Sequence, residues 1–184
     1  MKKNEGYTLI EMIIVISIIV VLSAMAYVSL SILSSARARD KAIEFDTDIA
    51  TLQTKARNMD AEFSFNSKTY NQFCIVFFTL GAGTDIYQAP GYYDIADDDC
   101  VVDITQKKKL PRKISMEFQG TSPHAGVLST TEPVGDDCNA IAVIRFNKRG
   151  ECMEGYGTYS FTQNKNGSTV AVTKIRQNGS HETK

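Results

Sequence analysis

The chain is poor in the side chains that most enzymes use for catalysis. It has two histidines, His124 and His181, no tryptophan and no glycine-rich phosphate-binding loop. Neither histidine lies close to a cysteine in the sequence, and no histidine pair has helical spacing, so metal-dependent and acid–base catalysis find little support. We therefore predict a protein that is not an enzyme and that uses no cofactor and no metal.

Charge of neither sign dominates. The 20 Lys and Arg residues oppose 21 Asp and Glu residues, for a formal net charge of −1, which argues against binding nucleic acid or an anionic membrane over the whole surface. Local clusters remain, and two basic sets fit a nucleic-acid contact as well as simple solvation. They are Lys107, Lys108, Lys109, Arg112 and Lys113 in a turn, and Lys174, Arg176, His181 and Lys184 near the C-terminus.

Acidic clusters are also present. Asp97, Asp98 and Asp99 with Asp103, and the pair at 136–137, are carboxylates that Ca²⁺ accepts as ligands. Their spacing lacks the glycine and the glutamate of an EF-hand loop. Solvated acidic loops are the favoured interpretation.

Proline and glycine are missing from residues 7–63, and residues 12–36 carry no charge. At about 1.5 Å per residue, a helix of this apolar stretch is long enough to cross about 30 Å of hydrocarbon. We predict a transmembrane helix over residues 7–35. Glu11 stands just inside its start, where a carboxylate is costly and usually marks a function or a partner. The alternative is that Glu11 snorkels to the lipid headgroups.

The helix is expected to continue as an amphipathic stem over residues 36–64. Apolar residues recur there at steps of three and four, which places them on one narrow face of a helix. These residues are Ala38, Ala42, Phe45, Ile49, Leu52, Ala56, Met59 and Phe63. We expect this stripe to pack on the chain's own sheet; a coiled-coil seam is the weaker alternative.

Residues 65–184 change to short β-branched and aromatic runs bounded by turn residues. The expected strands cover 73–80, 85–89, 100–105, 113–118, 140–147, 156–163 and 168–176. Asn166-Gly167 between the last two is a strong hairpin signal, because both central residues of a type I′ turn need positive φ. We predict an α+β fold in which a long N-terminal helix packs on a mostly antiparallel β-sheet head.

Four cysteines lie in the part of the chain that would be outside the membrane. Cys74, Cys100, Cys138 and Cys152 suit two disulfides in an oxidising compartment, and no pair has the close spacing of a zinc knuckle. Three connectivities are possible. Nearest-neighbour pairing, Cys74 with Cys100 and Cys138 with Cys152, is our working guess.

The N-terminus resembles the prepilin signal of type IV pilins and pseudopilins. Lys2 and Lys3 form a short basic leader that ends at Gly6, Tyr7 follows, and Glu11 stands five residues into the remaining chain. The resemblance implies cleavage between Gly6 and Tyr7 by a prepilin peptidase and N-methylation of Tyr7, although Phe is usual at this place in the family. It also implies that Glu11 meets the N-terminal amine of a neighbouring subunit during assembly.

This resemblance divides the chain into a leader at 1–6, a membrane helix at 7–35, a stem at 36–64 and a head at 65–184. The basic leader places the N-terminus in the cytoplasm. The protein is then expected to be a single-pass protein of the cytoplasmic membrane with its head outside, and later a filament subunit. Other pilins or pseudopilins and the inner-membrane assembly platform are the implied partners, besides the peptidase.

The element order of the head resembles the GspH/FimT group, which comprises minor pseudopilins of type II secretion systems and minor pilins of type IV pili. The resemblance rests on Leu110-Pro111, on a strand that ends at 145–150 and on the terminal hairpin. It implies a minor pilin or pseudopilin that initiates or joins a filament. Two alternatives stay open: a DNA-binding competence pilin that uses the basic sets, and a tip adhesin with an exposed aromatic loop at Tyr87, Tyr92 and Tyr93.

Overall fold

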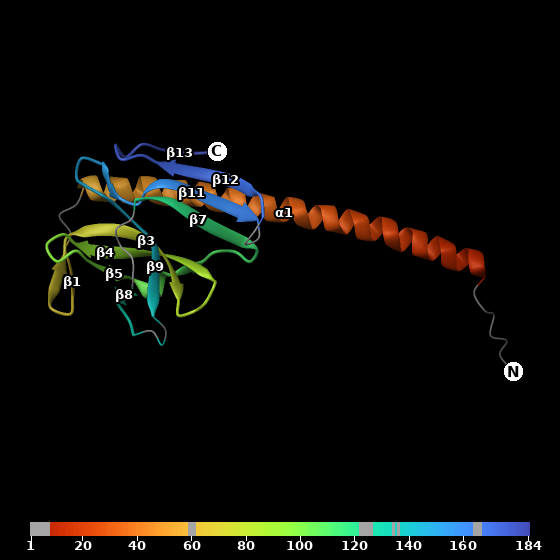
Figure 1. The fold of residues 1–184 in the computed structure, drawn as a ribbon, viewed down its shortest axis with the longest axis horizontal. Coiled ribbons are helices and arrows are strands. Elements are labelled where there is room, and N and C mark those ends of the chain that lie inside the picture. The colour runs from red at the N-terminus through yellow and green to blue at the C-terminus, as the bar shows by residue number, and fades with distance from the viewer. Residues whose placement is uncertain (1–7, 59–61, 122–126, 134, 136, 164–166) are drawn as a thin grey trace.

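A computed structural model of the protein describes residues 8–58, 62–121, 127–133, 135, 137–163 and 167–184. One long helix, α1 (Leu9–Asn58), projects from a β-rich head, and its N-terminal half extends free of that head (Figure 1). Lys55 and Arg57 in its last turn suit the negative end of the helix dipole. The long uninterrupted helix is therefore confirmed, while Tyr7 and Met59 lie outside the described residues.

The side chains described along α1 are those of residues 9–25 and 32–58, and within these segments no helical stretch is long and apolar enough to cross a membrane.

The stem half of α1 packs on the head through the predicted apolar stripe. Its members from Ala38 to Ala56 are all buried. Phe45 is the central one, with ring centroids 5.2 Å from Phe77 and 5.0 Å from Tyr159. Phe63 departs from the prediction: the helix ends before it, and Phe63 begins a strand.

The described residues of the head form strands and one short 3₁₀ helix. Their bounds are β1 (Phe63–Phe65), β2 (Lys68–Tyr70), β3 (Gln72–Leu80), β4 (Ile86–Asp94), β5 (Asp99–Val102), η1 (Ile104–Gln106), β6 (Lys108–Lys109), β7 (Ile114–Thr121), β8 (Val127–Thr130), β9 (Cys138–Phe146), β10 (Cys152–Glu154), β11 (Tyr156–Gln163), β12 (Thr169–Ile175) and β13 (His181–Thr183).

The described strands form a small two-stranded sheet, β1-β2, and two larger sheets. One has the order β10-β9-β3-β4-β5-β8, and β8 also pairs with β9, so that β9, β3, β4, β5 and β8 close into a ring. The other is the antiparallel sheet β13-β12-β11-β7. Every pairing is antiparallel among the described strands except that of β5 with β8. The α+β class is confirmed, but the head is partly barrel-like rather than one simple sheet.

Strand β3 separates two hydrophobic cores. Residues 74–78 are all buried. The side chains of alternate strand residues face opposite sides, and both faces of β3 are covered by a core. Cys74, Val76 and Phe78 belong to the ring interior, whereas Ile75 and Phe77 join the core beneath α1. The core beneath α1 also includes residues from β7, β9, β11 and β12. The stem is thus held against both larger sheets at once.

Candidate functional site at the helix N-terminus

The start of α1 is a reciprocal capping arrangement between Thr8 and Glu11. The backbone N–H and the Oγ1 hydroxyl of Thr8 donate to Glu11 Oε2 at 3.0 and 2.9 Å, and the Glu11 N–H donates to Thr8 Oγ1 at 3.3 Å. This satisfies donors that a helix N-terminus leaves unpaired. Sequence reasoning missed the role of Thr8, although a Thr three residues before a Glu is the known signal for it.

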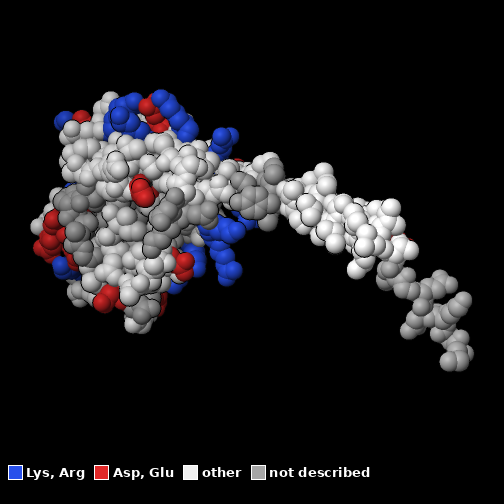
Figure 2. Space-filling model, turned by 45° about the vertical axis from the view of Figure 1, so that its right-hand side comes forward, with Lys and Arg blue, Asp and Glu red and all other residues white. Residues whose placement is uncertain are grey.

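Around Glu11, residues 9–25 of α1 form a rod that is apolar apart from Glu11, Ser17 and Ser23. Every residue from 9 to 25 is exposed, and Glu11 is the only charged one among them. Figure 2 shows this part as an almost uniformly white rod that emerges from the head. An exposed apolar surface of this length marks a contact with lipid or with other helices. The predicted cleavage and methylation positions, Gly6 and Tyr7, lie outside the described residues.

The head contacts the stem near the C-terminal end of α1 and along one flank of the helix. Gln53 Nε2 donates to the carbonyl oxygens of Gly150 at 2.7 Å and Gly179 at 3.2 Å. On β13, Thr183 Oγ1 donates to Asp46 Oδ1 at 3.1 Å. The C-terminal segment therefore lies along the helix as part of the head.

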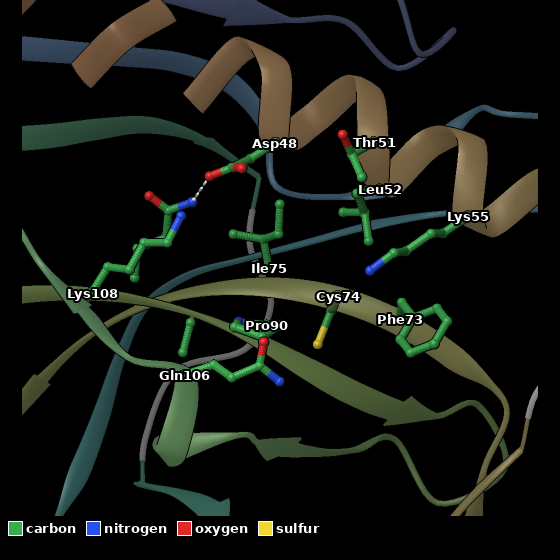
Figure 3. A pocket seen from close by; sticks show the side chains of 12 residues that line it. Asp48, Thr51, Leu52, Lys55, Phe73, Cys74, Ile75, Pro90, Gln106 and Lys108 are labelled. Atoms are coloured by element: carbon green, nitrogen blue, oxygen red, sulfur yellow. Dashed lines mark hydrogen bonds between the residues drawn. The ribbon is translucent and has the colours of Figure 1, made fainter. Parts of the chain in front are cut away.

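A cleft of about 170 Å³ lies between the opposite flank of α1 and strands β3 and β4 (Figure 3). Gln88 Nε2 donates to Asp48 Oδ2 at 2.7 Å across it. A carboxylate only accepts, so the amide must present its NH₂ to Asp48. The Gln88 Oε1 atom is then left buried, and it has no hydrogen-bond partner among the described residues. Lys55 extends into the cleft over the ring of Phe73, at 5.4 Å.

Two of the five basic residues in the turn, Lys108 and Lys109, have acidic partners in the structure. Lys108 pairs with Glu44 at 3.0 Å, Lys109 pairs with Asp85, and Lys107 lies over the ring of Tyr87 at 5.8 Å. Such contacts reduce what these lysines can offer to phosphate.

The two basic sets are not brought together. Lys108 of the turn contacts Glu44 on α1, whereas β13 of the C-terminal set contacts Asp46. Residues two apart on a helix point in nearly opposite directions, at about 200°. The two sets therefore flank the stem on opposite sides, and Arg176 of the second set pairs with Glu182 at 2.9 Å.

Two carboxylates of the acidic cluster, Asp97 and Asp99, already bind neighbouring side chains. Lys68 Nζ lies 3.0 Å from Asp97 and 3.4 Å from Asp99, and both carboxylates raise the pKa of Lys68. Tyr70 donates to Asp99 at 3.1 Å. These contacts explain the loop without a bound cation. Asp136 lies outside the described residues.

The aromatic loop predicted as an adhesive surface is not a loop. Tyr87, Tyr92 and Tyr93 all lie in β4. Tyr93 is buried and donates to Asp98, and the ring of Tyr92 stacks on Phe63 at 3.8 Å. Sequence reasoning stopped the strand at Pro90, whereas β4 continues through it to Asp94. The exposed-loop expectation is therefore wrong.

All four cysteines are buried and free in the structure. Cys74 and Cys100 have Sγ atoms 3.4 Å apart, whereas Cys138 begins β9 and Cys152 pairs with Phe146 at its other end. At about 3.3 Å per strand residue these ends are about 25 Å apart, and a disulfide needs Cα atoms within about 7 Å. The guessed Cys138–Cys152 pair is therefore wrong. Burial raises the pKa of each of these two thiols to about 12.

Comparison with known proteins adds one finding. Residues 1–27 match the family model described as the prokaryotic N-terminal methylation motif, which is the signature of type IV pilins and pseudopilins. The match includes Gly6, Tyr7, Thr8 and Glu11. No curated protein and no solved structure matches the chain.

Proposed function

We propose that the chain is a minor pilin or pseudopilin, a structural subunit that initiates or joins a type II secretion pseudopilus or a type IV pilus-like filament. The observation that carries the proposal is the methylation motif at residues 1–27, which includes the exposed apolar helix residues 9–25 and their single carboxylate, Glu11. A prepilin peptidase cleaves after Gly6 and methylates Tyr7. The mature subunit waits in the cytoplasmic membrane with its head outside.

Assembly, rather than catalysis, is the proposed mechanism. The apolar half of α1 leaves the lipid and packs laterally among other helices, and Glu11 meets the N-terminal amine of a neighbour. Both Thr8 donors reach Oε2 of Glu11, which leaves Oε1 for that amine. Within a bundle that excludes water, the ion pair is less screened than on a surface, so it is able to set axial register.

A minor role is favoured by the unbroken helix and by the head. Major pilins usually carry a helix-breaking proline within the membrane segment, whereas the first proline here is Pro90. The resemblance of the head to the GspH/FimT group points the same way. The DNA-binding alternative draws less support, because Lys108 and Lys109 have acidic partners and the two basic sets lie on opposite flanks of the stem.

The test is Glu11→Leu in the full chain, expressed beside a prepilin peptidase and partner pilins. The substitution makes the helix more apolar, so membrane insertion and cleavage after Gly6 should persist while recovery in sheared filaments falls strongly. Glu44→Gln, which changes a carboxylate on the stem, is the matched control and should assemble like wild type. Normal assembly of Glu11→Leu would contradict the proposed role of Glu11. An uncleaved N-terminus in the wild-type chain would contradict the prepilin assignment itself.

A further inference from the structure

The interior of the ring brings together two cysteines from strands that are not neighbours. Cys74 lies on β3 and Cys100 on β5, with β4 between them. Strands separated by one intervening strand stand about 10 Å apart in a sheet, yet the two Sγ atoms are 3.4 Å apart. Ring closure explains this approach, because side chains that point inward from a curved sheet converge. In Figure 3 the sulfur of Cys74 points to the side of β3 away from α1.

Gly91 opens the path between the two sulfurs. It is the β4 residue paired with Cys74. A Cβ atom at Gly91 would lie 2.9 Å from Cys74 Sγ and 2.8 Å from the carbonyl oxygen of Val101. Any other residue would therefore push Cys74 away from Cys100. Glycine weakens the interior of a strand and often marks a close approach of other groups, and the sulfur contact supplies that reason here.

We propose that Cys74 and Cys100 are the one disulfide-forming pair of this chain, and that Cys138 and Cys152 remain thiols. The bridge would link β3 to β5 across β4 and so stabilise this part of the ring. It revises the expectation of two bridges to one. The supply of oxidant rests on the proposed function, because only an exported head meets an oxidising compartment.

The chemistry is a thiol–disulfide exchange. The thiolate of one cysteine attacks the disulfide of an oxidising dithiol protein or of oxidised glutathione, and a mixed disulfide forms. The second cysteine then displaces that group. Two S–H bonds are lost from the chain, one S–S bond forms, and the oxidant leaves as two thiols with the two electrons.

The burial of the two cysteines implies that they are oxidised during folding. Cys74 and Cys100 are each only 1% exposed. The hydrogen bond with Cys74 and burial raise the pKa of Cys100 well above its ordinary value, and the thiol form is a poor nucleophile. The bridge therefore forms before the ring closes over it, and the closed ring then shields it from reductants.

Cys138 is the nearest competitor. It belongs to the same interior cluster, on β9, and its cross-strand partner is Leu128 on β8. Since β8 also pairs with β5 through Val101 and Ser129, Cys138 approaches Cys100 from the other side of the ring. A Cys100–Cys138 bridge is therefore the alternative that an experiment must separate.

Refolding decides between these pairs. The full chain, purified in detergent, is unfolded with reductant, refolded in a glutathione redox buffer, and then denatured and alkylated without reductant. Peptide mass mapping should find Cys74 linked to Cys100, and alkyl groups on Cys138 and Cys152. Alkylation of all four thiols, or a bridge that contains Cys138 or Cys152, would overturn the proposal.

Matched variants make the assignment quantitative. With four cysteines in the wild type, Cys74→Ser or Cys100→Ser should leave three free thiols, whereas Cys138→Ser or Cys152→Ser should leave one. A bridge that survives in Cys74→Ser would refute the pairing. The same mapping on the chain from cell membranes tests export separately: a chain that bridges on refolding but stays reduced in cells would contradict the proposed function and leave the pairing intact.

Discussion

The two halves of α1 have the same secondary structure and opposite surroundings. Residues 9–25 are almost entirely apolar and all exposed, whereas the stem buries one narrow stripe and leaves most of its polar side chains in solvent. A helix that is apolar all round needs a surrounding partner, while a striped helix needs a single surface. The chain supplies that surface for the stem alone. The partner of the first half must come from a membrane or from other subunits.

The largest expected effect tests the stem half. Phe45→Ala removes the ring that contacts Phe77 and Tyr159, and a buried Phe→Ala change costs about 3–5 kcal/mol. Thermal or urea unfolding of the purified full chain should show this loss. Ile43→Ala is the matched control, because Ile43 is 59% exposed on the same helix and should change stability by less than about 0.5 kcal/mol. Equal losses in both variants would refute the one-sided packing of the stem.

The second prediction concerns the ring on which the stem rests. The two cysteines of the proposed bridge are 26 positions apart, and closing a loop of that length stabilises a fold by about 3.5 kcal/mol. Oxidised wild type should lose about that much on reduction, while Cys74→Ser should be insensitive to reductant. The comparison uses chemical unfolding with and without reductant. Reductant sensitivity retained in Cys74→Ser would show that the stabilising bond lies elsewhere.

The third prediction sharpens the contrast at the exposed end of the helix. Thr8→Val keeps the shape of the side chain but removes the hydroxyl that exchanges hydrogen bonds with Glu11. Loss of an N-cap hydroxyl costs about 1 kcal/mol, so recovery in sheared filaments should fall less than in Glu11→Leu. Head stability should not change, which unfolding of the same sample would check. A stability loss equal to that of Phe45→Ala would mean that the two halves are coupled.

The smallest effect is electrostatic. The hydrogen bond from Lys41, with a further one from Lys108, lowers the pKa of Glu44 below 4.5. A lowered pKa stabilises the fold above the unfolded-state pKa, and this contribution disappears as the pH falls through the folded-state value. Glu44→Gln should therefore cost about 0.5 kcal/mol at neutral pH, as a partly exposed pair does, and nothing in strong acid. A cost that is independent of pH would exclude the ion pair as its cause.

Local sequence determined α1 and the strongest strands. The absence of proline and glycine, the spacing from Ala38 to Ala56 and the Thr8–Glu11 cap all act within a few turns of one helix, so they are readable in the sequence. The runs of β3, β9, β11 and β12 are readable for the same reason, since each is long and rich in strand-forming residues. The strands β1, β10 and β13 have three residues each, which is too short to carry such a signal, and they depend on their neighbours.

Tertiary structure alone decided what depends on distant segments. Ring closure comes from the pairing of β8 with both β5 and β9, and it brings Cys74 to Cys100 while β9 holds Cys138 and Cys152 apart. The opposite placement of the two basic sets follows from how α1 lies between its contacts at Glu44 and Asp46. Periodicity determines which face of an element is apolar because it acts over neighbouring residues. It contains no information on which distant strand closes a sheet. The closure of the sheet determined which cysteines lie close together, and the packing of the head on α1 determined where the charged residues lie.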